Sequence, residues 1–94
     1  MFLGKRLKEL REQKEFLQRQ LAAKLEIDTP MYSKIERGER NAKREQVQKL
    51  SKIFEVEESE LLTLWLAGKI YDLIKDESIA KSAIAIVQSH IHEF

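Results

Sequence analysis

The sequence has 94 residues, of which 43% are hydrophobic and 35% are charged, and its formal net charge is +1. Such a chain can fold as one small domain with its own core, and because it has no run of about 18 apolar residues, we expect no transmembrane helix. It has no cysteine, which excludes disulfides and thiolate metal sites and favours a cytoplasmic protein.

The first two predicted helices cover about residues 3–14 and 18–25. In the first, Leu3, Leu7 and Leu10 recur at spacings of four and three residues and form one apolar stripe. The composition agrees with helices, because one Pro and three Gly accompany many Leu, Lys, Glu, Gln and Ala. The predicted fold class is therefore all-α.

A third helix is predicted in the stretch "DTPMYSKIERGER", residues 28–40. Asp28 or Thr29 provides the N-cap, and Pro30 suits the first turn, where a missing N–H costs little. Gly38 ends the helix, because glycine takes the left-handed conformation without strain. The second and third helices are thus joined by about three residues, which is the pattern of a helix-turn-helix.

Two further segments complete the expected order of helices. A fourth helix covers about residues 43–54, and "EVEESELL" predicts a turn and a short helix that ends near Leu62. Residues 63–94 contain more apolar residues than one narrow helix face can hold, so we expect a helical hairpin there. Ser78 is the expected N-cap of its last helix, which runs to about residue 92.

The charges are divided unevenly along the chain. Residues 1–52 carry 14 Lys or Arg against 8 Asp or Glu, a net charge of +6, whereas residues 53–94 carry 3 against 8, a net charge of −5. This asymmetry indicates a basic working half and a separate acidic half. A chance imbalance on solvated helix faces is the simpler alternative.

Residues 10–62 resemble the Cro/CI (XRE-type) helix-turn-helix repressors. An ordered set of motifs carries the resemblance: Leu10-Arg11, Gln18, "LAAKL", "SKIERGER", and a run of spaced apolar residues that ends at Val56. A lone helix-turn-helix pattern is a weak signal, but this set in this order is specific. The small size is also similar to that of the controller proteins of restriction–modification systems.

The resemblance implies a fold and a way of docking on DNA. A five-helix, lambda-repressor-like DNA-binding domain is expected over residues 3–62, with the helix-turn-helix at 18–37. The remaining residues, 63–94, would form a helical extension. The recognition helix, about residues 29–37, is expected to lie in the major groove, with the N-terminal part of the helix near the base edges.

The resemblance also implies roles for individual residues. The residues expected to face the bases are Thr29, Pro30, Ser33 and Lys34. The residues expected to contact phosphates are Gln18, Arg37, Arg40, Asn41 and Arg44. Arg11 and Glu36 match a pair that forms a structural salt bridge in several members of the family, so they are expected to bind each other and not DNA. Tyr32 and Ile35 lie on the opposite face of the recognition helix and are expected in the core.

Three positions depart from the family pattern. Glu26 stands in the turn, where the family usually has glycine, and a left-handed conformation there would cost about 1–2 kcal/mol. Leu17 replaces the usual threonine cap of the second helix. Pro30 stands where repressors often place a glutamine or arginine, and it can only pack, for example against a thymine methyl group. Discrimination between operators must then use fewer hydrogen bonds, or partly DNA shape.

The apolar surplus of residues 63–94 needs another surface to cover it. We expect this extension to form a homodimer. The interface residues expected are Trp65, Leu66, Ile70, Ile84 and Val87. The alternative is that the extension packs back on its own domain.

The predicted function is a sequence-specific transcriptional regulator that binds a palindromic operator in double-stranded DNA as a homodimer. One alternative is the antitoxin of a toxin–antitoxin pair. Another is a protein-interaction module that has lost DNA binding, against which the basic run after Gly38 argues. No enzyme, cofactor, membrane partner or small-molecule ligand is expected. His90 and His92 do not predict a metal site, because residues two apart face different sides of a helix.

Overall fold

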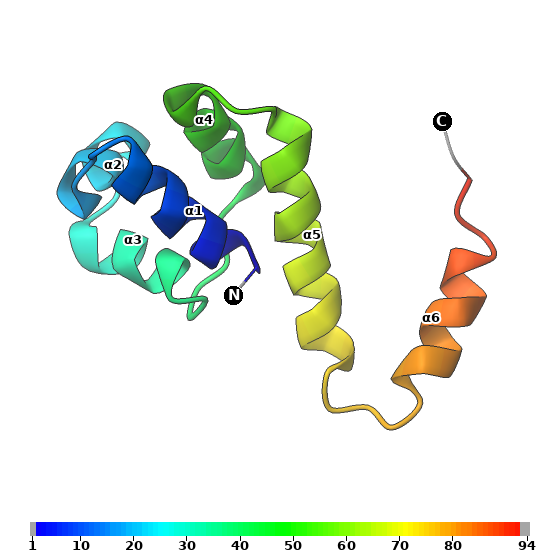
Figure 1. Ribbon diagram of the computed structural model, residues 1–94. Coiled ribbons are helices and arrows are strands. Elements are labelled where there is room, and N and C mark those ends of the chain that lie inside the picture. The colour runs from blue at the N-terminus through cyan, green and yellow to red at the C-terminus, as the bar shows by residue number, and fades with distance from the viewer. Residues whose placement is uncertain (1, 93–94) are drawn as a thin grey trace.

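The computed structural model describes residues 2–92, and throughout this range the regular structure is helical. The helices are α1 Phe2–Gln13, α2 Gln18–Leu25, α3 Thr29–Glu36, α4 Arg44–Phe54, α5 Glu58–Ile74 and α6 Ala80–Gln88. Figure 1 shows α1 to α4 and the first part of α5 gathered into one body, from which the rest of α5 and α6 project as an open V. The all-α fold class predicted from the sequence is confirmed.

One hydrophobic core holds α1 to α4 and the beginning of α5 together. α5 packs against α1 and α4, while α3 packs against α1 and α2. The buried apolar residues are Leu3, Leu7, Leu10, Leu21, Ala22, Leu25, Tyr32, Ile35, Ala42, Val47, Leu50, Phe54 and Leu61. In α1 to α4 most of them recur at three- or four-residue spacings, so each of these helices turns one apolar face inward. The expectation that Tyr32 and Ile35 belong to the core is confirmed.

α1 and α3 approach each other closely at Gly4. A Cβ atom on Gly4 would lie 2.3 Å from the carbonyl oxygen of Glu36 and 2.8 Å from that of Ile35. Both distances are far below van der Waals contact, and both atoms belong to the backbone, which cannot rotate away. Glycine at this position therefore allows α1 to lie against the C-terminal end of α3.

Three helix ends use glutamate in the left-handed backbone conformation. Glu15, Glu26 and Glu55 have φ angles of 59°, 59° and 57°, where the Cβ atom crowds the following carbonyl oxygen at a cost of roughly 1–2 kcal/mol. The N–H groups of Glu26 and Glu55 donate the backbone hydrogen bonds that close α2 and α4. Gly38, with a φ of 75°, makes the same kind of turn after α3 without this strain.

α2 and α4 begin without a capping side chain at the preceding residue. Instead, a glutamine three residues further on reaches back: Gln20 Oε1 accepts a hydrogen bond from Leu17 N, and Gln46 Oε1 accepts one from Lys43 N, both at 2.8 Å. This contact is one half of a capping box. It explains how α2 begins after Leu17, whose side chain has no acceptor.

The helices after residue 57 differ from the sequence-based prediction. α5 runs without interruption from Glu58 to Ile74 and crosses the expected boundary near residue 62. α6 begins at Ala80 and ends at Gln88, before the expected end at residue 92. The expectation that Ser78 caps the last helix is wrong, because the turn continues one residue further, with Ala80 N donating to Glu77 O at 3.2 Å, and leaves Ile79 at the N-cap.

The distal part of α5 and all of α6 leave apolar side chains uncovered. No residue of α6 is buried, and the exposed fractions of Leu66, Ile70, Ile84 and Val87 are 50%, 48%, 41% and 58%. None of the helices within residues 2–92 has the length and apolar character needed to cross a membrane. The uncovered side chains lie on the two arms of the V, α5 and α6.

Candidate nucleic-acid interface

The helix-turn-helix consists of α2, α3 and the short turn at residues 26–28. Asp28 is the N-cap of α3, and its Oδ1 accepts a hydrogen bond from the backbone N–H of Met31 at 2.8 Å. Pro30 lies in the first turn of α3, where a missing N–H breaks no helical hydrogen bond. The left-handed conformation of Glu26 reverses the chain before this cap. These local contacts fix the start of α3 relative to α2.

α3 has one face in the core and one face in solvent. On the inner face, Tyr32 and Ile35 are only 0% and 3% exposed. On the outer face, Thr29, Pro30 and Lys34 are exposed. Because the residues near the start of this face are short, a large surface can approach the helix closely along it. Ser33 is half-buried at the edge of this face, as is Met31.

A buried ion pair ties α1, α2 and α3 together beneath the outer face. Arg11 Nε lies 2.8 Å from Glu36 Oε2, and Arg11 Nη2 donates to Glu36 Oε1 at 3.2 Å. Gln18 Nε2 donates to the same Oε1 at 3.1 Å, and Arg11 Nη1 donates to the carbonyl oxygen of Phe16 at 3.3 Å. The side chains of Arg11 and Glu36 are only 15% and 3% exposed, so solvent screens their attraction little.

The hydroxyl group of Tyr32 lies beside this network. It is buried, and within residues 2–92 it makes no hydrogen bond. Burial and the neighbouring Glu36 carboxylate raise the pKa of Tyr32 far above its usual range, while the hydrogen bonds that Arg11 donates to Glu36 raise the pKa of Arg11. Arg11 is therefore charged and Tyr32 neutral at any physiological pH.

A second, exposed group of side chains lies at the end of α3. Arg37 donates hydrogen bonds to the hydroxyl oxygen of Ser33 and to a carboxylate oxygen of Glu39. The hydrogen bond from Arg37 lowers the pKa of Glu39 below its usual range, so the carboxylate stays charged at neutral pH. Sequence reasoning named Ser33 and Arg37 but missed Glu39, although the alternation "ERGER" brings glutamate next to both arginines.

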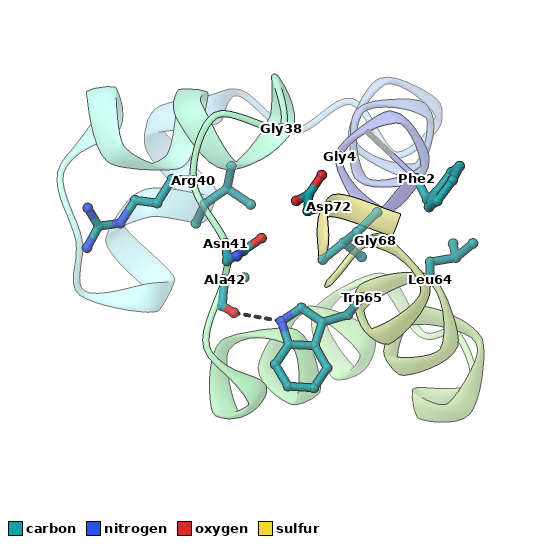
Figure 2. A pocket seen from close by; sticks show the side chains of 12 residues that line it. Phe2, Gly4, Gly38, Arg40, Asn41, Ala42, Leu64, Trp65, Gly68 and Asp72 are labelled. Atoms are coloured by element: carbon teal, nitrogen blue, oxygen red, sulfur yellow. Dashed lines mark hydrogen bonds between the residues drawn. The ribbon is translucent and has the colours of Figure 1, made fainter. Parts of the chain in front are cut away.

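The connection from α3 to α4, residues 37–43, adds further cations to this side of the molecule. Arg40, Asn41 and Arg44 are exposed, and Figure 2 shows the Arg40 side chain extending away from the core. Arg44 is the first residue of α4, so its charge lies beside the N-terminal amides of that helix. Amides and cations together favour an anion here.

α1 contributes two lysines that were not predicted from the sequence to contact DNA. Lys5 and Lys8 line one shallow hollow together with Gln18, Ser33 and Arg37. The hollow also reaches the buried pair of Arg11 and Glu36. The position of Lys5 and Lys8 off the leucine stripe of α1 predicts their exposure, but only the packing of α1 on α3 through Gly4 brings them next to the helix-turn-helix.

The residues expected at a dimer interface do not all lie on one free surface. Leu66, Ile70, Ile84 and Val87 are uncovered. Trp65, by contrast, packs against the core, and its indole Nε1–H donates to the carbonyl oxygen of Ala42 at 2.7 Å. Trp65 is therefore half-buried against its own chain, and its place in a dimer interface stays a prediction.

Comparisons with known proteins give one match. A protein-family model described as "Helix-turn-helix" matches residues 7–61, more than half of the chain. Neither the curated proteins nor the solved structures gave a significant match. The matched range includes α2 and α3 and the buried pair of Arg11 and Glu36, and it ends at the last buried residue of the core, Leu61.

Proposed function

Because this chain belongs to the helix-turn-helix family of the Cro/CI type, whose members are DNA-binding regulators, we propose that it binds a palindromic operator in double-stranded DNA as a homodimer. The recognition helix α3 lies in the major groove. One observation supports this most directly: α3 keeps an outer face free of its own chain and is followed by a run of exposed cations. Those cations would meet the phosphates on the edge of the groove.

Three exposed residues of α3 read the bases in this proposal. The ammonium group of Lys34 can donate to O6 or N7 of a guanine. Thr29 and Pro30 lie at the N-terminal end, which in this docking mode is nearest the base edges. Pro30 offers no hydrogen bond and packs on a thymine methyl group. Ser33 completes the set, but its hydroxyl is already bound by Arg37, so it discriminates less than Lys34.

The phosphates are bound on both sides of α3. Gln18 approaches from the start of α2, while the other residues follow α3 in the chain: Arg37, Arg40, Asn41 and Arg44. Lys5 and Lys8 extend this surface, because they line the same hollow as Gln18 and Arg37. Contacts of this kind fix the register of the protein on DNA and carry no sequence information themselves.

The homodimer forms through the uncovered faces of α5 and α6. The exposed residues Leu66, Ile70 and Leu73 recur at spacings of four and three residues along α5, which is the spacing of a helix–helix seam. α6 has nine residues and buries none of them, and so short a helix is marginal in water by itself. Two such hairpins would cover each other as a four-helix bundle.

The low net charge of the extension allows its uncovered apolar faces to pack against those of a second copy of the chain. Residues 63–94 carry three Lys and four Asp or Glu, a net charge of only −1, so two copies repel each other little. The acidic excess seen in the sequence lies instead before the extension, where Glu55, Glu57, Glu58 and Glu60 cluster at the start of α5. A dimer also doubles the small number of base contacts available from one α3, because each copy reads one half-site.

This proposal divides the chain at a point inside α5. Residues 3–62 form the reading domain, in which the recognition helix occupies about residues 29–37, and the helical extension of residues 63–94 forms the dimer. Because α5 belongs to both parts, the reading domain and the dimer surface move as one body.

The test compares a base-reading residue with a phosphate-binding residue. Lys34→Ala should weaken binding to a duplex selected from random DNA more than binding to a scrambled duplex, with about 1–3 kcal/mol less discrimination. Arg40→Ala should weaken both duplexes similarly. It should also reduce the salt slope of binding by about one unit, because each phosphate contact releases roughly one counterion.

Lys52→Ala is the matched control, because it removes the same charge from the acidic cluster at the start of α5 and should change neither property. If Lys34→Ala weakened binding to both duplexes equally and Arg40→Ala had no effect, this docking would be contradicted.

Sedimentation at micromolar concentration should give a dimer, and a protein that remains monomeric would contradict the two-fold arrangement. If the unmodified protein bound no duplex at low salt, a protein-interaction module that has lost DNA binding would be the better assignment.

A further inference from the structure

Trp65 is the single tryptophan of the chain, and it joins α5 to the connection between α3 and α4. Its Nε1–H donates a 2.7 Å hydrogen bond to the carbonyl oxygen of Ala42 (Figure 2). Ala42 is 5% exposed, whereas its neighbours Arg40 and Asn41 are in solvent. Trp65 thus binds Ala42, the one buried residue of the connection at residues 37–43, whose other residues are exposed.

A small cavity separates this connection from α5. Figure 2 shows Gly38, Asn41 and Ala42 on one side of it and Gly68 and Asp72 on the other. Its volume of about 50 Å³ exceeds the roughly 10–15 Å³ that one water needs, so the connection is not packed tightly on α5. Among the side-chain hydrogen bonds of residues 2–92, the bond from Trp65 is the one that joins this connection to α5.

The ring of Trp65 also lies against Arg44. The guanidinium carbon of Arg44 is 5.0 Å from the ring centroid, and Nζ of Lys69 is 4.2 Å from it. A guanidinium that lies over an aromatic ring uses its flat face and leaves its N–H donors free in the plane. These are the donors that bind two phosphate oxygens at once. The ring also offsets the unfavourable position of a cation at the N-terminus of α4.

We propose that Trp65 is a positioning residue for DNA binding, which holds Ala42 and Arg44 in the geometry that a phosphate group requires. The inference rests on the proposed DNA binding and deepens it, because it assigns to α5 a role in phosphate recognition. Trp65 does not touch DNA itself. It acts through the backbone of the connection and through the guanidinium of Arg44.

A double-mutant cycle tests this role. In the otherwise unchanged protein, Arg44→Ala should weaken binding to selected and scrambled duplexes by about tenfold, as expected for a charged hydrogen bond to phosphate. In the Trp65→Leu background, Arg44→Ala should weaken binding by less than about twofold, because Arg44 is no longer held in place. If Trp65 served only the stability of the fold, the two losses would be additive, and additive losses would overturn the proposal.

Two further variants separate the ring from its N–H group. Trp65→Phe keeps an aromatic ring but removes the bond to Ala42, so the effect of Arg44→Ala should fall between the two values. If circular dichroism shows that Trp65→Leu does not fold, Trp65→Phe takes its place in the double-mutant cycle. Lys69→Ala removes the other cation near the ring and should leave the tenfold effect of Arg44→Ala unchanged. Loss of that effect in the Lys69→Ala background would count against a specific role for Arg44.

The fluorescence of Trp65 gives an independent readout. Its emission should change as DNA is added, with the same midpoint as binding measured by gel shift, and Arg44→Ala should remove most of this change. Unchanged emission while DNA binds would overturn the role of Trp65 and leave the proposed function intact. Absence of DNA binding by the unmodified protein would overturn the proposed function itself, so the two failures are distinguishable.

Discussion

Apolar side chains are mostly buried in residues 2–61, whereas none is buried in residues 62–92. In the first region every helix contributes to one closed core, and the last fully covered residue is Leu61. In the second region no residue is buried, although isoleucine, leucine and valine are frequent. The same continuous helix, α5, passes from one region into the other.

The comparison shows that apolar content does not predict where a core forms. α1 to α4 are amphipathic, and each finds a partner within the chain. The distal part of α5 and α6 are at least as apolar, but α6 is directed away from the core (Figure 1). Substitutions of apolar residues in residues 2–61 are therefore expected to change the stability of the folded monomer. Substitutions in residues 62–92 are expected to change stability only when that region packs against another surface.

The largest effect is expected where the first region buries a charge. Glu36→Ala removes the partner of Arg11 and an acceptor of Gln18, and leaves a guanidinium that is only 15% exposed without its carboxylate. Breaking a buried pair in this way costs about 3–5 kcal/mol. Denaturation by urea should show this loss in the free energy of unfolding. Glu9→Ala, which breaks an exposed pair with Arg6, is the control and should cost under about 1 kcal/mol.

Two leucines on α5 test the boundary between the regions. Leu61→Ala should lower the free energy of unfolding by about 2–5 kcal/mol at any protein concentration, because Leu61 is 0% exposed. Leu66→Ala should have little effect on the dilute protein, because Leu66 is 50% exposed. At high concentration it should lower the melting temperature, since it weakens only the associated state. A loss for Leu66→Ala that is the same at every concentration would mean that the extension packs on its own domain.

Two glycines extend the comparison from side chains to the backbone. Gly4→Ala places a Cβ atom 2.3 Å from the Glu36 carbonyl oxygen, and the required shift of α1 should cost about 1–3 kcal/mol. Gly68→Ala is the matched change on α5, where the nearest atom, Cδ2 of Phe2, is 4.0 Å away. It should be neutral or stabilise α5 by up to about 1 kcal/mol. Thermal melts of the two variants should therefore shift in opposite directions, or only that of Gly4→Ala should fall.

The smallest effect is expected at the exposed end of α3. Glu39→Gln should leave the unfolding curve unchanged, because both Arg37 and Glu39 are solvated. It should strengthen binding to any duplex about two- to threefold, since the charge of Arg37 is no longer paired with a carboxylate. Titration at two salt concentrations measures this, and weaker binding would mean that Glu39 orients Arg37 instead of competing with DNA.

The sequence predicts the helix-turn-helix closely because its signals are local. Asp28 caps α3 and Gly38 takes the left-handed conformation, as their neighbours in the sequence indicate. The expected break near Leu62 is absent because no residue there interrupts a helix, and apolar residues on several faces do not end one. Helix ends without such residues, as at Ile79, cannot be read from local patterns.

Contacts between distant segments account for most of what the sequence does not predict. The bond from Trp65 to Ala42 joins residues 23 apart, and no spacing rule indicates it. The pairing of Arg11 with Glu36 was expected from the family resemblance, but the hydrogen bond from Gln18 to the same carboxylate was not. Lys5 and Lys8 come close to α3 only because Gly4 allows α1 to pack there.

The continuity of α5 has a consequence for the layout of the operator. Its 17 residues form a rod of about 25 Å at 1.5 Å per residue, with no flexible linker between the part held by the core and the part proposed to form the dimer. A dimer joined through such rods holds its two recognition helices at one separation and one rotation. One base pair added between the half-sites turns one of them by roughly a tenth of a helical turn. If the proposed dimer forms, the length of the spacer between the half-sites is part of what the protein recognises, although no side chain reads the bases of the spacer.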